Sequence, residues 1–485
     1  MIRRTLLSTS VNEWTCSWGP DVLWLKLCAL FLATLLCGCS HLPPPPASRI
    51  VPPPHWGEEG HSKGAPSRAA WWTLFRDSEL NRIAPKAIDA QPNLLLARGK
   101  ADEARAHTGA ALAHAWPTLQ FDPSAGKARN SSNDEPYGVL RPFFTAAPYD
   151  RYLTPLSASY AIDVFGRSRK ELCAMRLNEC AAEADVAAAQ PLITGELGQA
   201  YFLVQSLALE HDLLSRTISD RSGQVEIQES LVKAGKANEV ALARSRLELA
   251  QVRLDEAGIR ASQHASLHAL AILCGEPPAN FKAPALRPLP DPPAIPSGVP
   301  ADILARRPDL VAARARLEAA LSKEEAAQRA FFPTIQLTAA GGYASTDLSK
   351  LIRPASLAWS VGAGLSQVVF DGGLRKANVK AARARYEQAV AQYDSTLLTA
   401  FREVEDALSR LSFVRVEGTK AEEAEHAARE MADIALARYK DGLSSYDPVI
   451  DANHTLLEIS RRRIQIQRAL CDGTIQLIVA LGGCW

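Results

Sequence analysis

The chain has 485 residues, which is enough for two to four ordinary domains or for one long, non-globular architecture. Its 54 Lys and Arg balance 53 Asp and Glu, so the net charge of +1 gives no reason to expect nucleic acid as a partner. Only 7% of residues are aromatic, and long Ala-rich stretches favour close-packed helices over a bulky core.

An apolar segment near the N-terminus ends at a pair of cysteines. Leu27–Leu36 contains no charged residue and is too short to span about 30 Å of hydrocarbon. It runs into Leu36-Cys37-Gly38-Cys39, which resembles the lipobox of bacterial lipoproteins. This resemblance implies that residues 1–38 are a cleaved signal peptide and that Cys39 carries acyl chains, which would anchor the mature chain. A plain signal peptide, or a buried strand ending in Cys, is the alternative.

The segment after Cys39 is rich in proline and cannot form a helix. Residues 41–56 read HLPPPPASRIVPPPHW, for which polyproline II is the natural state. We therefore expect residues 39–70 to form a lipid anchor and a Pro-rich strut that leads to the folded body. A recognition motif for a proline-binding module is the alternative.

The rest of the chain contains an internal two-fold repeat. Four pairs of segments occur in the same order in both halves, at offsets that vary only as loop lengths would. The pairs are HAWPTLQFDPSAG (114–126) with AFFPTIQLTAAGG (330–342), ASYAIDVFGRSRK (158–170) with AGLSQVVFDGGLRK (363–376), LVKAGKANEV with RYKDGLSSYD, and LAILCGEPP with LIVALGGCW.

These pairs define the predicted domain organisation. The first repeat covers residues 71–274 and the second covers residues 301–485, with a Pro-rich crossover at 275–300 between them. Each repeat has one plan: helix, strand, loop, strand, helix, turn, helix. The third pair of segments aligns Gly235 with Gly442, and we expect both glycines at turns between helices.

The predicted strands alternate between apolar and polar or small residues. In the fourth, Trp359, Val361 and Leu365 lie on one face and serine or glycine lies on the other. Strands of about 10 residues with this pattern are typical of membrane β-barrels, although a soluble sandwich gives the same alternation. Four strands cannot close a barrel in lipid, because open edges are not tolerated there. Unless the strands are soluble, several chains must share one barrel.

The predicted helices are long. From about Arg167 to the turn before Gly235, Pro191 is the only proline, and some 60 residues would extend roughly 90 Å. The returning helix carries two apolar rows, one through Val240, Leu247 and Leu254 and a second beside it. Two rows require neighbours on two sides, as in the wall of a cylinder.

No pattern in the sequence indicates an enzyme or a metal site. The chain has no G-x-S-x-G, no H-E-x-x-H and no phosphate-binding loop. Its cysteines outside the leader form no C-x-x-C pair and have no His at ligand spacing. We therefore predict no enzymatic activity, no bound metal and no cofactor other than lipid on Cys39. Cys173 and Cys180, seven apart on one predicted helix, are expected to be buried.

Several motifs together resemble one family over nearly all of the mature chain. WWTLFRDSEL, ASYAIDVFGRSR, ILARRPDLVAARARLEAA, AFFPTIQLT, QVVFDGGLRKANV, AFREVEDAL and RYKDGLSSYDPVIDA are similar to outer membrane efflux proteins of the TolC type, in their lipoprotein branch. The resemblance implies an α+β membrane protein. Three identical chains would form a 12-stranded β-barrel, four strands per chain, continued by a long α-helical periplasmic barrel.

The resemblance also implies a function and partners. The protein would be a passive exit duct in the bacterial outer membrane, conducting small toxic compounds or drugs. A periplasmic adaptor and an inner-membrane resistance-nodulation-division pump would deliver them. Two alternatives stay open: the duct of an ABC-type secretion system, and a periplasmic coiled-coil scaffold lipoprotein that is not a channel.

In this family, acidic residues after the turn glycine narrow the closed pore at the periplasmic tip. Carried over to this chain, the resemblance makes Asp451, nine residues after Gly442, a gate candidate. Pro448 replaces the other usual acid, with Asp447 beside it, and Tyr439 is a further candidate for the tip's hydrogen bonds. Ser444 stands where some members have a locking Arg. The alternative is that Asp447 and Asp451 only cap a helix.

Overall fold

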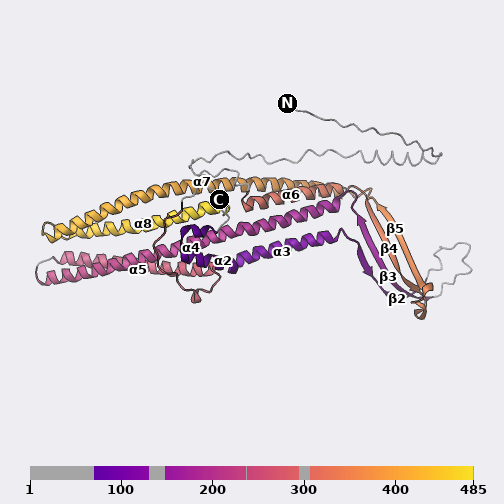
Figure 1. Cartoon of the computed structure of the whole chain (residues 1–485), viewed down its shortest axis with the longest axis horizontal. Coiled ribbons are helices and arrows are strands. Elements are labelled where there is room, and N and C mark those ends of the chain that lie inside the picture. Colours follow the sequence, from indigo (N-terminus) through magenta and orange to yellow (C-terminus); the bar gives the residue numbers. More distant parts are fainter. Residues whose placement is uncertain (1–69, 130–147, 236–237, 294–305, 484–485) are drawn as a thin grey trace, which may run out of the picture. The chain divides into compact units, whose positions relative to one another are not determined.

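The computed structural model describes residues 70–129, 148–235, 238–293 and 306–483. The predicted signal peptide, Cys39 and the strut up to residue 69 lie outside these ranges. None of the helices described is both long enough and apolar enough to cross a membrane. These helices are α2 (Ser78–Ala90), α3 (Pro92–Ala113), α4 (Arg167–Lys233), α5 (Glu239–Leu273), α6 (Pro308–Arg329), α7 (Leu374–Lys440) and α8 (Asp447–Ala480), drawn in Figure 1.

The strands form one antiparallel sheet. They are β1 (Thr118–Phe121), β2 (Ser124–Ala128), β3 (Tyr149–Ile162), β4 (Thr334–Ser345) and β5 (Leu357–Ser366). β1 and β2 pair with β3 in a single register, with Thr118 opposite Ser159 and Ser124 opposite Leu153. They are therefore one strand, interrupted at Pro123, which has no N–H to donate. The chain thus supplies four strands, as predicted. In the described part of the chain, β1 with β2 and β5 form the two unpaired edges.

One face of β5 is apolar and exposed. Trp359, Val361 and Leu365 are 77%, 76% and 69% exposed, and they alternate with glycine or serine. Exposed large apolar side chains on a sheet in water would promote aggregation, whereas on a barrel in lipid they form the outward-facing band. The alternation predicted from the sequence is therefore present in the sheet.

Two helices of 67 residues each, α4 and α7, form the frame of the helical part. At 1.5 Å per residue each is about 100 Å long. Each follows a strand through a left-handed glycine, Gly166 (φ 77°) before α4 and Gly373 (φ 92°) before α7. Pro191 lies inside α4 without ending it. The long helix predicted from Arg167 to the turn at Gly235 is confirmed.

The internal repeat is visible where helices meet end to end. Two residues after the end of α5 comes Gly275 (φ 71°), where an added Cβ would lie 2.7 Å from the Cβ of Ala90, at the boundary between α2 and α3. Two residues after the end of α8 comes Gly482 (φ 82°), where an added Cβ would lie 3.3 Å from Cδ of Pro308, the first residue of α6. In each repeat, the glycine after the returning helix therefore contacts the start of a shorter helix, and the two glycines are at equivalent positions of the repeat.

A buried cluster joins the N-terminal segment to α4 and α8. Trp71 packs on Gly198 of α4, where an added Cβ would lie 2.8 Å from the Trp71 ring and 2.9 Å from Ile475. Tyr201 is fully buried and donates a 2.8 Å hydrogen bond to Asp77, the N-cap of α2. This bond fixes α2 against the middle of α4.

The prediction that Cys173 and Cys180 are both buried is wrong: Cys180 is exposed, and Cys173 is only half-buried. The face of α4 that is covered passes through Ala181, which packs against Ala312 and Ala315 of α6. Neighbouring residues of an α-helix are rotated by about 100° from each other, so Cys180 points away from that contact.

Asp472 of α8 is a largely buried carboxylate, with 14% of its side chain exposed, and this burial predicts a pH-dependent stability. Burial raises the pKa of its carboxyl to about 6, although Arg468 and Arg410 oppose the shift. The carboxyl loses its proton near pH 4 in the unfolded chain but only near pH 6 in the folded chain. The free energy of unfolding therefore decreases as the pH rises from about 4 to about 6. The loss attributable to this group is about 3 kcal/mol at most.

We therefore expect Asp472→Asn to be more stable than the native chain at pH 7.5 and equally stable at pH 4. Denaturant unfolding at both values measures this difference. A variant that gains nothing at pH 7.5 would contradict the account of Asp472.

Candidate functional site

Two tight turns form the tips of the two helical hairpins. Gly235, after α4, and Gly442, after α7, have φ of 69° and 70° and both are exposed. The N–H of Gly442 bonds to the carbonyl of Tyr439, and the N–H of Leu443 bonds to the carbonyl of Arg438 at 2.8 Å. This is the Schellman arrangement, in which glycine takes the left-handed position after a helix. The two predicted turn glycines lie at turns.

Arg244 of α5 joins the two hairpins at these tips. Its Nη1 donates to Asp447 at 3.0 Å, and its Nη2 donates to Asp451 one turn further along α8. All three side chains are partly exposed, from 39% for Arg244 to 65% for Asp451. The structure thus brings both predicted gate acids onto a single cation. Neither carboxylate provides the N-cap of α8, which is Tyr446 with no side-chain capping bond.

Tyr439 makes a second connection between the hairpins. Its hydroxyl accepts a 3.4 Å hydrogen bond from Nε2 of Gln228 on α4, and its ring lies 4.9 Å from the ring of Tyr446. Burial raises the pKa of Tyr446 to about 12. The oxygens of Tyr446 and Ser444 are buried and have no hydrogen-bond partner among the described residues. Tyr439 therefore acts as both a hydrogen-bonding and a packing residue.

A third connection lies further from the tips, at Arg461 of α8. It pairs with Asp255 of α5 at 3.3 Å and lies 3.7 Å from Glu210 of α4, whose side chain is only 4% exposed. Burial raises the pKa of the Glu210 carboxyl, and Gln465 and Arg461 oppose this shift. Residues 244 and 255 of α5 are separated by 11 positions, or about 16 Å of helix. The hairpins are therefore joined at two levels.

Sequence reasoning missed Arg244 and Gln228. Both contact residues about 200 positions away, and no local periodicity signals such a pair. One indirect signal was present: because Ser444 replaces the locking Arg of some relatives, two acids were left without an evident cation. The structure supplies that cation from the opposite hairpin.

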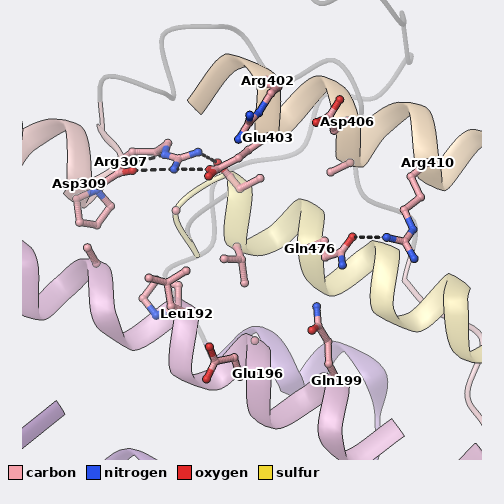
Figure 2. A pocket seen from close by; sticks show the side chains of 18 residues that line it. Leu192, Glu196, Gln199, Arg307, Asp309, Arg402, Glu403, Asp406, Arg410 and Gln476 are labelled. Atoms are coloured by element: carbon pink, nitrogen blue, oxygen red, sulfur yellow. Dashed lines mark hydrogen bonds and ion pairs between the residues drawn. The ribbon is translucent and has the colours of Figure 1, made fainter. Parts of the chain in front are cut away.

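The structure also contains a hollow of about 480 Å³ between α4, α7, α8 and the start of α6 (Figure 2). Arg307 lies at the edge of this hollow, and its guanidinium group bonds to three other residues. It donates to the Ala480 carbonyl at 2.6 Å, to both carboxylate oxygens of Asp309, and to Glu403 at 2.8 Å. Its role is to hold the end of α8 on the start of α6. The described residues include no group of three or more His, Cys, Asp or Glu that could hold a metal ion.

Comparison with known proteins shows which family this chain belongs to. The outer membrane efflux protein family matches residues 83–276 and 299–483 of the chain. The chain belongs to this family. Members of the outer membrane efflux protein family are transport channels, and the two matched segments flank the Pro-rich region between the repeats.

Relatives of known role match over nearly the whole chain. OprJ, an outer membrane protein of Pseudomonas aeruginosa, is 30% identical over 480 residues, covering 94% of this chain and 95% of OprJ. SrpC of Pseudomonas putida, the outer membrane protein of a solvent efflux pump, is 28% identical and covers 95% of this chain and 98% of SrpC.

The solved structure of the channel protein CusC has a TM-score of 0.79 at 26% identity, covering 90% of this chain and 99% of CusC. This outer membrane efflux protein is therefore an outer-membrane channel with a helical periplasmic part.

Proposed function

We propose that the chain forms, as a homotrimer, the exit duct of a tripartite efflux system. A periplasmic adaptor and an inner-membrane pump of the resistance-nodulation-division type would deliver small toxic compounds or drugs. Conduction would be passive, because the pump supplies the energy. One observation carries this proposal: among the described residues, the sheet of a single chain is open, with β5 at one unpaired edge and β1 with β2 at the other. Lipid does not tolerate such edges, and three chains of four strands give a closed barrel of twelve.

The helices support the same closure. On α5, Val240, Leu247 and Leu254 repeat every seven residues and are 70%, 57% and 74% exposed. On α7, Met431 and Ile434 are 44% and 52% exposed. α5 and α7 are the outer helices of the layer, on either side of α4 and α8. These apolar stripes would be buried when α5 of one copy packs against α7 of the next.

The relatives favour small molecules as cargo. SrpC is named for solvent efflux and CusC for cation efflux. In-cell cross-linking followed by mild-detergent extraction and mass spectrometry tests the assignment of partners. We expect an adaptor and a resistance-nodulation-division pump to co-purify. An ABC exporter instead would move the function to secretion, and the absence of any inner-membrane partner would contradict the tripartite assignment.

We further propose that the tip contacts form the resting gate. Arg244 holds Asp447 and Asp451 on the opposite hairpin, and Tyr439 adds its bond to Gln228. Opening the tip would require the hairpins to separate, which breaks these contacts. The two ion pairs of Arg244 are partly exposed, so each is weak on its own, which suits a gate that an adaptor must open.

We also propose that Cys39 carries the lipid anchor. Replacing it by Ser should abolish incorporation of an alkyne-tagged palmitate in growing cells. Cys37→Ser is the matched control, because it leaves the Cys after the predicted cleavage site in place. Equal labelling of the two variants would rule out Cys39 as the modified residue.

A further inference from the structure

Two aromatic rings stack where the sheet meets the helices within one chain. Phe165, between β3 and α4, lies on Phe332, just before β4, with ring centroids 4.8 Å apart and ring planes 10° from parallel. Both side chains are half-buried. Nη1 of Arg329 donates to the carbonyls of Phe165 and Gly166, which holds the two segments together. This stack joins the last strand of the first repeat to the first strand of the second.

Each partner in this stack has an aromatic counterpart in the other repeat. The segments IDVFGRSRK and QVVFDGGLRK place Phe370 at the position of Phe165. The segments AWPTLQ and FFPTIQ place Trp116 at the position of Phe332. The counterparts do not meet in one chain, because Phe370 follows the edge strand β5 and Trp116 precedes the opposite edge strand β1. They are 87% and 67% exposed.

We infer that Phe370 of one subunit stacks on Trp116 of the next and closes each seam between subunits at the boundary of barrel and helices. The inference rests on the proposed homotrimer and specifies its interface. In a closed ring built from equivalent repeats, the contact between β5 and the next β1 takes the place of the contact between β3 and β4. The aromatic pair would then repeat at every boundary between repeats, alternately within and between chains.

The main competing role for these rings is contact with lipid. Membrane barrels carry aromatic girdles at the water interface, and exposed rings at strand ends would fit such a girdle. The stack of Phe165 on Phe332 favours a contact between subunits over contact with lipid. In that stack the two equivalent rings lie against each other, each on a neighbouring segment of protein. Edges that must pair would also bring the two strand ends together.

The test uses a photo-cross-linking amino acid, p-benzoylphenylalanine, in place of Trp116 in the full-length chain in outer membranes. We expect a covalent dimer whose link maps to residues around Phe370. The same amino acid in place of Phe332 is the matched control and should link only to Phe165 of its own chain. Phe370→Ala should abolish the mapped link, and Phe370→Trp should preserve it.

The oligomer is measured separately by native mass spectrometry on the same preparations. A trimer that gives only lipid adducts from position 116, or no product, would overturn the seam while leaving the proposed function intact. A chain that never forms trimers would overturn the proposed function itself. A dimer linked at a site far from Phe370 would also contradict the proposed contact.

Discussion

Replacing Arg244 with alanine should raise the conductance of the channel in planar bilayers and increase the cell's permeability to bulky antibiotics. Among the described residues, Arg244 is the cation that pairs with both Asp447 and Asp451 on the opposite hairpin, and the change removes it. Partly exposed pairs of this kind are together worth about 1 kcal/mol per chain, which is about a fivefold change in the population of open tips. The two carboxylates left behind, one turn apart on α8, would also repel each other and destabilise the start of that helix.

Arg246→Ala is the matched control for this experiment. Arg246 lies two residues from Arg244 and also makes an ion pair, at 2.7 Å, but its partner Glu229 belongs to the same hairpin. Losing that pair removes a charge without separating the hairpins, so conductance should stay unchanged. If both variants open the channel equally, the effect comes from the lost charge and the role assigned to Arg244 is wrong.

The largest effect on stability is expected for Arg307→Ala. The guanidinium is 8% exposed and joins the end of α8, the start of α6 and Glu403 of α7. Its removal would leave the Ala480 carbonyl without its donor and would take the guanidinium away from Asp309 and Glu403. Asp309 and Glu403 are 36% and 42% exposed and become hydrated, so the cost comes from the Ala480 carbonyl and the lost charge-assisted bonds, together about 3 kcal/mol. The denaturant midpoint of the purified channel should therefore fall substantially.

The neighbouring residue provides the control. Arg306 is exposed, and Arg306→Ala should change stability by less than about 0.5 kcal/mol. Arg307→Lys should lie between alanine and the native residue, because a single ammonium cannot reproduce the fork of bonds to Asp309 and Ala480. A native-like midpoint for Arg307→Ala would refute the structural role of this residue.

The sequence predicted those parts of the fold that repeat or alternate locally. Four strands, two long helices and the glycine turns all follow from periodicity, from the order of the paired segments and from the scarcity of proline. Hydrophobic periodicity reports which face of an element is covered, so it also indicated that α5 needs a neighbour beyond its own hairpin. Asp447 and Asp451 were predicted as gate residues from the family resemblance and not from the hydrophobic periodicity.

The contacts that hold the elements together could not be predicted in the same way. Arg244 meets Asp447 across 203 positions, and nothing in its own segment distinguishes it from Arg246. The exposure of Cys180 depends on which side of α4 faces α6. Ala181, the next residue along the helix, is the one that packs there. The interruption at Pro123 divides one predicted strand into β1 and β2. Both pair with β3 in the same register, so the sheet itself is as predicted.

Native mass spectrometry of the lipidated protein, extracted from outer membranes in mild detergent, tests the central claim most directly. The sheet, whose two edge strands are unpaired among the described residues, requires a closed oligomer, and the resemblance to the family predicts a single species containing three chains. A monomer that keeps its strands under the same conditions, or a closed assembly of another number of copies, would contradict a twelve-stranded barrel shared by three subunits.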